Sequence, residues 1–389
     1  MQPILILGSG LGGYSLAREV RKLDRTTPIT LISRDAASFY AKPNLSNAFA
    51  SKKFLNALQG ISAEQMAADL SITVLPRSEV TQIDRARGVV VLRDSDLGYH
   101  SLVLATGADP IALPLEGNAA HVVMRVNDVE DYARFRQRLS LGGHSNRPKH
   151  VTILGAGLIG CEFANDLLAA GHRVTVLDPV LLPLGRLLPV QAGVLFRDRL
   201  AAAGVDWQLG HTLARLEHSG DRLLATHGDG RVHETDLVLS AVGLKPRTQL
   251  AAMAGLRLAR GIVANEWLQT SDPHIYALGD CVEAGGQVLP YVLPIMQQAR
   301  ALAKTLTGTP TRLVYPAMPV MVKTPALPTV VAPPTGSGEW HIVNQSPDAL
   351  EAEFMSPSGA LNGFVLMGSS TRLRTAWTQR IAGNLPGNA

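Results

Sequence analysis

The chain has 389 residues, of which 46% are hydrophobic and 17% charged, with a formal net charge of +4. This length favours two or three domains, and the composition is that of a globular protein with enough apolar residues for large cores. The basic excess is mild and spread along the chain, which argues against a nucleic-acid partner but is compatible with an acidic protein partner.

The first predicted element is a strand at residues 4–7, followed by a glycine-rich turn and a helix that includes Tyr14. Gly8, Gly10 and Gly13 have the G-x-G-x-x-G spacing in the strand–turn–helix context that indicates a dinucleotide site. Gly8 permits the tight turn, Gly10 lets the backbone approach a pyrophosphate, and Gly13 lets the helix pack closely on the strand. The helix N-terminus attracts the phosphates. This stretch alone does not distinguish between dinucleotides.

The N-terminal sequence also bears on location. Met1 is followed almost at once by the predicted strand, so we expect no signal peptide. No uninterrupted apolar run reaches the length of a membrane span. We therefore expect a cytoplasmic protein that is not inserted in a membrane.

A second strand is predicted at 28–33, ending at Ser33 and followed by Arg34 and Asp35. Asp35 follows the last glycine by about twenty residues, where an acid accepts a hydrogen bond from a ribose hydroxyl. Lys42 lies in the loop beyond it. Further strands are predicted at 71–75, 89–92 and 102–104, the last ending in the small-residue turn Ala105-Thr106-Gly107. Residues 109–114 are interpreted as a linker.

The opening pattern then returns. A helix over 126–139 and a polar turn over 142–149 precede a strand at 151–154 and a second G-x-G-x-x-G, formed by Gly155, Gly157 and Gly160. The next strand ends on Asp178, about twenty residues after these glycines. Two complete fingerprints predict two bound dinucleotides. A carboxylate at Asp178 favours NADH, because it would repel the 2′-phosphate of NADP.

The rest of the chain supplies four further predictions. Residues 236–243 repeat the pattern of 102–107, with Val242 and Gly243 at the turn. A short strand at 275–277 delivers Asp280 into a Gly-Asp turn, where an aspartate is also a common cap. A helix follows at 296–306, and residues 310–389 are interpreted as a small α+β domain.

This series of motifs resembles the FAD-dependent pyridine-nucleotide oxidoreductases over nearly the whole chain. The resemblance implies an α/β protein with two Rossmann-like (three-layer ββα) dinucleotide-binding domains, the second inserted in the first, plus a small α+β C-terminal domain. The implied FAD-binding domain comprises residues 1–112 and 240–309, the NAD-binding domain 113–239, and the C-terminal domain 310–389. Residues 14–24, 131–137, 154–167 and above all 322–326 are similar to the rubredoxin-reducing members of that family.

The resemblance also implies the site residues. Lys42 and Glu162 would lie beside the flavin ring near N5, and Val292 and Lys323 against its pyrimidine edge. The full set implied for FAD is Gly8, Ser9, Gly10, Leu11, Gly12, Gly13, Ser33, Arg34, Asp35, Lys42, Val80, Ala105, Thr106, Gly107, Glu162, Asp280, Val292 and Lys323. The set implied for NAD is Gly155, Gly157, Leu158, Ile159, Gly160, Asp178, Val242 and Gly243.

The chain lacks the paired redox cysteines of disulfide reductases. Its two cysteines, Cys161 and Cys281, stand far apart, which excludes a disulfide framework and a zinc site, so no metal is expected. Both are interpreted as packing residues. The region of Lys42, where single-cysteine relatives carry a cysteine, has none. Reduced flavin must therefore pass its electrons to an acceptor outside the chain.

The predicted activity is electron transfer from NADH through FAD, one electron at a time, to rubredoxin, a small acidic iron protein. Lys323 would stabilise reduced flavin, and an ion pair between Lys42 and Glu162 would shield N5. A basic rim would steer the acceptor, with these candidates: Lys42, Arg300, Lys304, Arg372, Arg374 and Arg380. The resemblance suggests a role in alkane hydroxylation or oxygen-stress defence.

Other functions stay open at this point. Ferredoxin, or a rubredoxin-like domain of a larger protein, could be the acceptor. An NADH oxidase or a disulfide reductase is disfavoured by the missing cysteine. A non-catalytic NADH-sensing flavoprotein has the same fold.

Overall fold

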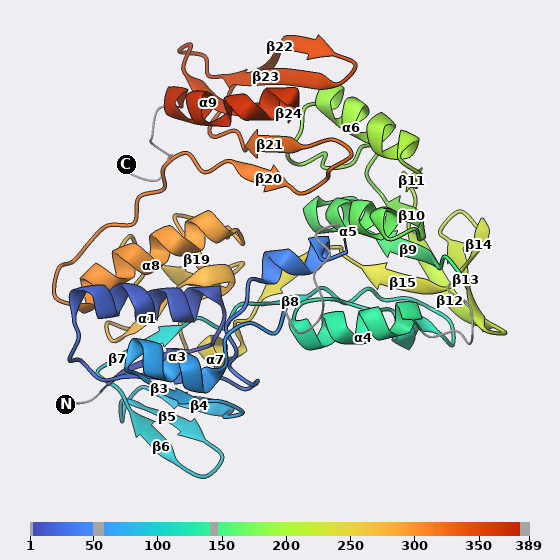
Figure 1. The fold of residues 1–389 in the computed structure, drawn as a ribbon. Coiled ribbons are helices and arrows are strands. Elements are labelled where there is room, and N and C mark those ends of the chain that lie inside the picture. Colours follow the sequence, from blue (N-terminus) through green and yellow to red (C-terminus); the bar gives the residue numbers. More distant parts are fainter. Residues whose placement is uncertain (1–2, 50–57, 141–146, 382–389) are drawn as a thin grey trace.

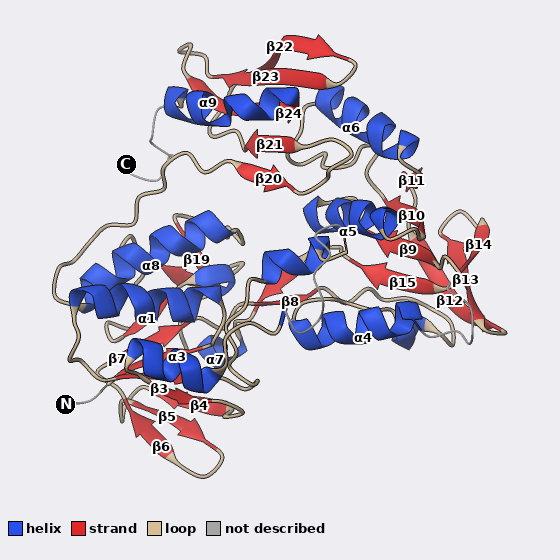
Figure 2. Cartoon of the chain, viewed as in Figure 1, coloured by secondary structure: helices blue, strands red, loops and turns tan. Residues whose placement is uncertain are grey.

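The computed structural model describes residues 3–49, 58–140 and 147–381 (Figure 1). The predicted polar turn over 142–149 lies largely outside these ranges. Figure 2 shows three groups of strands, each accompanied by helices, which correspond to three regions of the fold. Within the described ranges no helix is both long enough and apolar enough to cross a membrane.

The first region is built on a parallel five-stranded sheet with the order β18-β7-β1-β2-β3. The central strand β1 (Ile4–Leu7) is fully buried, as expected for an apolar run covered on both faces of a parallel sheet. The other strands are β2 (Ile29–Ile32), β3 (Thr73–Leu75), β7 (Ser101–Leu104) and β18 (Ile275–Ala277). Because β18 pairs with β7, the chain leaves this sheet and returns to it much later.

The helices of this region are α1 (Leu11–Leu23), α3 (Ala63–Leu70) and α8 (Val292–Leu306), and α1 and α8 lie side by side in Figure 1. Helix α8 begins four residues before the predicted start at 296. Its first turn contains Pro294, which a helix tolerates there because the first N–H groups have no intrahelical partner.

The second region repeats this arrangement around the order β11-β10-β9-β15, again all parallel. Its strands are β9 (His150–Leu154), β10 (Arg173–Asp178), β11 (Val205–Leu209) and β15 (Leu237–Ser240), and its helices are α4 (Val129–Ser140), α5 (Leu158–Ala169) and α6 (Val190–Ala202). The predicted α/β class with two Rossmann-like sheets is confirmed.

Each parallel sheet is accompanied by a three-stranded antiparallel sheet, which supplies the third layer. The first comprises β4 (Val80–Asp84), β5 (Val89–Leu92) and β6 (Asp96–Gly98). The second comprises β12 (Leu213–Ser219), β13 (Arg222–His227) and β14 (Val232–Thr235). Shorter elements are α7 (Gln249–Met253), β17 (Ile262–Ala264), β19 (Val282–Ala284), η1 (Lys42–Asn47), η2 (Ala120–Val122) and η3 (Gly279–Cys281).

The predicted linker over 109–114 is only partly irregular. Its start belongs to β8 (Ala108–Pro110), which pairs antiparallel with β16 (Leu244–Pro246). These strands are the two crossings between the first and second regions. They lie together because each supplies backbone partners to the other, as in the hydrogen bond of 2.9 Å from Arg247 N–H to the Gly107 carbonyl.

The third region is an antiparallel five-stranded sheet of order β20-β21-β24-β23-β22. Its strands are β20 (Val320–Val322), β21 (Thr329–Ala332), β22 (Glu339–Ser346), β23 (Ala349–Met355) and β24 (Leu361–Gly368), followed by η4 (Ser369–Leu373) and α9 (Arg374–Arg380). One hydrophobic cluster contains both Phe163 of α5 and Val365 of β24, so the third region packs on the second. An ion pair of 2.7 Å between Arg199 and Asp348 joins them further out.

Candidate functional site

The first glycine turn is shaped by contacts that only glycine permits. Gly8 has a φ of +120°, and a Cβ on it would overlap the Ala105 carbonyl oxygen. A Cβ on Gly13 would overlap the Gly8 carbonyl oxygen, so α1 packs directly on the end of β1. A Cβ on Gly10 would meet no protein atom within 4 Å. The turn therefore has no room for a side chain at Gly8 or Gly13, whereas the space beside Gly10 is free of protein atoms.

Hydroxyl and carboxyl groups hold the ends of β1 and β2 together. Ser9 Oγ lies 2.7 Å from Ser33 Oγ, and Asp35 Oδ1 accepts hydrogen bonds from Ser33 Oγ (2.7 Å) and the Ala37 N–H (2.8 Å). Burial raises the pKa of the Asp35 carboxyl, but its hydrogen bonds outweigh burial and leave the pKa below its usual value. Arg34 is exposed beside this group, 3.8 Å from Asp109.

A cavity of about 900 Å³ lies where the three regions meet. It brings together thirteen of the predicted site residues, which are Gly10, Leu11, Gly12, Lys42, Ala105, Gly107, Leu158, Ile159, Glu162, Gly243, Asp280, Val292 and Lys323. The other predicted residues do not line it: Gly8, Ser9, Gly13, Ser33, Arg34, Asp35, Val80, Thr106, Gly155, Gly157, Gly160, Asp178 and Val242. Several of these shape the turns behind it, whereas Val80 starts β4 opposite Leu92.

Glu162 is the most deeply buried charged group at the cavity, with only 1% of the residue exposed. Its Oε2 lies 2.8 Å from Lys323 Nζ, and its Oε1 accepts a 3.0 Å hydrogen bond from the Lys323 N–H. Ser46 Oγ donates to Oε2 and accepts from Lys323 Nζ at 3.1 Å. These residues belong to α5, the third region and η1, so one polar network joins all three regions.

This network corrects the predicted ion pair between Lys42 and Glu162. Within the described ranges the cationic partner of Glu162 is Lys323, and no ion pair of Lys42 is found. The pairing differs because the third region places both the backbone N–H and the ammonium group of Lys323 against the carboxylate.

Lys42 instead faces Asp280, which η3 delivers into the cavity. Burial lowers the pKa of the Lys42 ammonium group, and the charge of Asp280 partly offsets this effect. Burial raises the pKa of the Asp280 carboxyl, with Lys42 and Arg247 acting in the opposite direction. The two groups therefore favour each other's charged forms at the wall of the cavity, where Lys42 is exposed to solvent and Asp280 half-buried.

The second glycine turn repeats the geometry of the first. A Cβ on Gly155 would lie 2.6 Å from the Ala241 carbonyl oxygen, whereas a Cβ on Gly157 would meet nothing within 4 Å. Asp178 ends β10, as predicted, and its carboxylate accepts hydrogen bonds from the N–H groups of Ala156 (2.6 Å) and Val180 (2.9 Å). The acid is thus fixed at the entrance of the second turn. Val242 packs on the hydrophobic cluster behind this turn.

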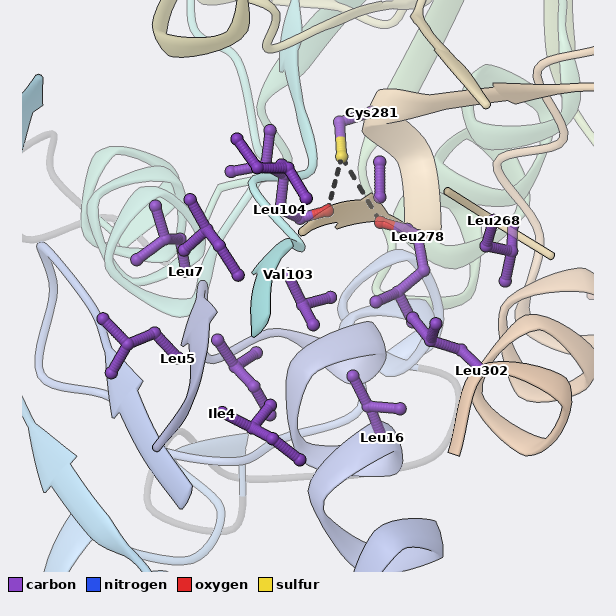
Figure 3. Close-up of a cluster of buried hydrophobic side chains, with 14 of the residues drawn as sticks. Ile4, Leu5, Leu7, Leu16, Val103, Leu104, Leu268, Leu278, Cys281 and Leu302 are labelled. Atoms are coloured by element: carbon purple, nitrogen blue, oxygen red, sulfur yellow. Dashed lines mark hydrogen bonds between the residues drawn. The ribbon is translucent and has the colours of Figure 1, made fainter. Parts of the chain in front are cut away.

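Both cysteines are free and buried. Cys281 Sγ donates to the carbonyl oxygens of Leu104 and Leu278, each at 3.3 Å, within the apolar core of the first region (Figure 3). Cys161 Sγ donates to the Ala156 carbonyl at 3.4 Å. Burial raises the pKa of both thiols, which keeps them protonated and unreactive. Their interpretation as packing residues is confirmed.

The rim of the cavity is less basic than predicted. Of the six cationic candidates only Lys42 and Arg374 line it, while Arg380 pairs with Glu353 at 3.2 Å. Exposed apolar side chains line it instead: Ile159, Leu244, Val292, Leu293 and Met321. The chain pattern alone did not show which cations on α8 and α9 face this opening.

Two site residues were missed in the sequence. Ser46 is 3% exposed, and its sequence context gives no sign of the distant carboxylate that it contacts. Arg247 donates from Nη1 to the Thr106 carbonyl (2.9 Å) and from Nε to Asp109 (2.7 Å), bracing the Ala105–Gly107 turn. Its position just after the Ala241–Gly243 turn was the only available signal.

These residues fit a flavin dinucleotide at the first turn and a pyridine nucleotide at the second. At each turn one glycine is open to the space in which a pyrophosphate would lie, and the first N–H groups of α1 and α5 have no intrahelical acceptor. The cavity wall is mostly apolar with a small number of charged and polar groups, as expected for a large aromatic ligand.

Comparison with known proteins agrees with this geometry. Residues 2–303 match the pyridine nucleotide-disulphide oxidoreductase family, and residues 312–381 match the rubredoxin binding C-terminal domain family. The chain is 43% identical to a rubredoxin-NAD(+) reductase of Alcanivorax borkumensis, over 99% of this chain and 100% of that protein.

Two further comparisons concern a curated relative and a solved structure. The chain is 40% identical to a nitric oxide reductase FlRd-NAD(+) reductase of Aeromonas hydrophila subsp. hydrophila, over 94% of this chain and 92% of the relative. Its fold is similar to the reductase chain in the crystal structure of the covalent putidaredoxin reductase–putidaredoxin complex, with a TM-score of 0.86 and 26% identity over 97% of this chain and 93% of that chain.

Proposed function

Because the chain belongs to the pyridine nucleotide-disulphide oxidoreductase family, we propose that this oxidoreductase takes electrons from NADH, passes them through FAD, and delivers them to rubredoxin. The observation that carries the proposal is the cavity lined by Gly10 to Gly12 of the first turn, by Leu158 and Ile159 of the second, and by Lys323 of the third region. The match of that third region to the rubredoxin binding domain supports the choice of acceptor.

The first fingerprint is the proposed FAD site. Gly10 to Gly13 would receive the pyrophosphate at the start of α1, Asp280 would contact the ribityl and phosphate region, and Lys42 would lie beside the flavin ring near N5. Ser33 and Asp35 are proposed to bind the ribose, since Asp35 Oδ1 is already oriented by Ser9 and Ser33. Bound FAD would supply the conversion of a hydride into two single electrons, which no side chain can perform.

Glu162 and Lys323 are the proposed groups beside the ring. The backbone N–H and ammonium group of Lys323 grip the carboxylate of Glu162, so α5 and the third region are held at a constant separation. The ammonium group would also bring positive charge to the ring, where negative charge develops on reduction. Ser46 keeps both groups in position from η1.

The second fingerprint is the proposed NADH site. Gly155 to Gly160 would receive the pyrophosphate at the start of α5, and Leu158 and Ile159 line the adjoining cavity. Asp178 is held at the turn by two backbone N–H groups, so its carboxylate cannot easily move away from the ribose. A 2′-phosphate would meet this negative charge, which supports a preference for NADH over NADPH.

The acceptor must lie outside the chain. The two cysteines are both buried with raised thiol pKa values, so neither can relay electrons as a redox disulfide. Exposed apolar side chains such as Leu293 and Met321, with Arg374 beside them, form a rim on which a small electron carrier could dock. We also propose a cytoplasmic location, where NADH is available and free thiols persist.

Stopped-flow spectroscopy tests this function. The FAD-loaded protein is reduced with NADH and then mixed with oxidised rubredoxin, oxidised ferredoxin or oxygen in separate shots. We expect flavin reoxidation by rubredoxin to be at least about tenfold faster than by either alternative, equivalent to about 1.4 kcal/mol in the barrier. Equal rates with ferredoxin would remove the acceptor assignment. Fast reoxidation by oxygen alone would indicate an NADH oxidase, and slow reoxidation by all three a sensor.

A further inference from the structure

A second cavity, of about 460 Å³, lies in the second region and shares no residue with the first. Its walls come from the beginnings of β9, β10 and β11 on one side and from β13 and β14 on the other, including His150, Arg173 and His233. The second glycine turn and Asp178 lie at the opposite, carboxyl ends of β9 and β10. This pocket is therefore at the far edge of the sheet from the proposed NADH site.

The pocket interrupts an otherwise apolar packing of two layers. Elsewhere the parallel sheet meets the β12–β14 sheet through side chains such as Leu154, Leu177 and Leu216, which form one hydrophobic cluster. At the pocket, the same two layers present histidine, arginine and threonine side chains instead. Burying polar groups between two sheets lowers the stability of the fold unless those groups have hydrogen-bond partners.

A chain of hydrogen bonds in this wall ends without a partner. Thr152 Oγ1 lies 2.9 Å from His233 Nε2, and His233 Nδ1 lies 2.9 Å from His227 Nε2. His227 is only 4% exposed, and its Nδ1 is buried with no hydrogen-bond partner. A ligand that paired with this atom would recover part of the about 1–3 kcal/mol that a buried unpaired polar atom costs.

The two rings are neutral in this setting. Burial lowers the pKa of His233 to about 4 and also lowers the pKa of His227. Each neutral ring carries one N–H, so the direction of the hydrogen bonds from Thr152 through His233 to His227 decides whether His227 Nδ1 is a donor or an acceptor. It offers either a lone pair or an N–H to the pocket. A ligand group that both donates and accepts hydrogen bonds satisfies it in both cases.

Three arginines surround the same space, Arg173, Arg222 and Arg231, of which Arg231 ion-pairs with Asp229 at 2.8 Å. Arg222 ion-pairs with Glu234 through Nη1, and its Nε, which is buried without a hydrogen-bond acceptor, lies 3.9 Å from Asp236 Oδ1. Arg173 is exposed and has no ion pair in the described part of the chain. The other acid of the wall, Asp206, already accepts hydrogen bonds from Thr175 and Gln208, each through a separate oxygen.

We propose that this pocket binds a phosphate group, as hydrogen phosphate or a phosphate monoester. Phosphate oxygens match the guanidinium group of Arg173, the one arginine of this wall without an ion pair among the described residues. The hydroxyl group of a hydrogen phosphate can donate a hydrogen bond to His227 Nδ1 when that atom is unprotonated and accept one when it is protonated. A metal ion fits less well, since among the residues that the structure describes no three suitable side chains converge as ligands.

Isothermal titration of the FAD-loaded protein with inorganic phosphate tests this site, with chloride at matched ionic strength as the reference. We expect saturable binding above the reference, and at least about fivefold weaker binding in Arg173→Ala and in His227→Gln. Arg173 is a surface residue, so its variant should fold even if His227→Gln does not. The matched control is Arg197→Ala on α6, an exposed arginine of the same region that pairs with its neighbour Asp198.

The outcomes separate cleanly. Binding that both pocket variants weaken and the control leaves within about twofold supports the site. The comparison of inorganic phosphate with glycerol 3-phosphate then shows whether free phosphate or a monoester binds more tightly, and both results support a phosphate site. No saturable binding, or binding that Arg173→Ala and His227→Gln leave unchanged, overturns the proposal. Neither result depends on the identity of the electron acceptor.

Discussion

Alanine substitutions at three glycines of the first turn distinguish effects on packing from effects on cofactor binding, because the added methyl group meets different surroundings at each position. At Gly13 the Cβ would lie well under 3.0 Å from the Gly8 carbonyl oxygen and 3.1 Å from its carbon. Both are backbone atoms and cannot turn aside. At Gly12 the nearest atom is Leu278 Cδ1 at 3.4 Å, an ordinary contact, and at Gly10 there is no atom within 4 Å.

The magnitudes follow from these contacts. For Gly13→Ala, forcing α1 away from β1 costs up to about 3 kcal/mol, and the better helix propensity of alanine returns up to about 1 kcal/mol. We therefore expect a net loss of about 2 kcal/mol in unfolding free energy. Gly12→Ala is the matched control, with no loss. Gly10→Ala should leave the stability of the flavin-free chain unchanged, because its φ of −70° and ψ of −171° suit alanine.

Flavin binding gives the second readout. The methyl group of Gly10→Ala projects into the space that the proposed pyrophosphate needs, so we expect FAD affinity to fall at least tenfold, which is about 1.4 kcal/mol. Urea unfolding of the flavin-free proteins measures stability, and flavin fluorescence titration measures affinity. Undiminished FAD binding by Gly10→Ala would refute the first turn as the flavin seat. Equal stability of Gly13→Ala and Gly12→Ala would refute the packing argument.

Four further predictions test other parts of the site. Lys323→Met should destabilise the protein by about 3 kcal/mol because it leaves Glu162 buried without its cationic partner. Glu162→Gln should destabilise it less, because the Lys323 side chain that loses its partner is 28% exposed. Urea unfolding, followed by flavin release, measures which variant loses more unfolding free energy. Ser46→Ala should slow flavin reduction at saturating NADH with little change in the KM for NADH, and an unchanged rate would contradict a positioning role. Asp178→Asn, which keeps an acceptor for its backbone N–H, should lower the KM for NADPH at least about tenfold in steady-state assays, by removing charge repulsion. Finally, burial lowers the pKa of His233 in the folded state to about 4, below its unfolded value of about 6.5, so the ring stays neutral in the folded protein while the unfolded chain gains a proton. The free energy of unfolding should therefore fall as pH drops from 6.5 towards 4, by about 1–2 kcal/mol for this half-buried ring. His233→Gln should flatten the dependence of Tm on pH.

Most of the architecture could be predicted because its signals are local. The buried run of β1 and the turn at Gly8 are set by apolar burial and backbone sterics over a few residues. The strand ending at Asp178 was placed correctly for the same reason. The paired crossing strands β8 and β16 were not expected, because their stability comes from each other across a long stretch of intervening chain.

The side-chain pairing of the site shows the same limit more sharply. The family resemblance placed two lysines, Lys42 and Lys323, beside the flavin with Glu162, and neither is near Glu162 along the chain. Chain connectivity does not favour Lys42 or Lys323, and the choice rests on the docking of the third region, which brings the Lys323 N–H and ammonium group to the carboxylate together. The unpaired Nδ1 of His227 was equally invisible in the sequence, because it depends on how two sheets stack.

The amino-acid sequence by itself therefore determined two glycine turns, the acid at Asp178, the absence of a redox cysteine pair and the α/β class. Each of these depends on residue type, local backbone geometry or short-range periodicity. The tertiary structure alone decided which cation meets Glu162, which rim residues surround the cavity, and where a second polar pocket opens. These features depend on surfaces that come together only after the three regions have packed, since burial and charge pairing act through space and not along the chain.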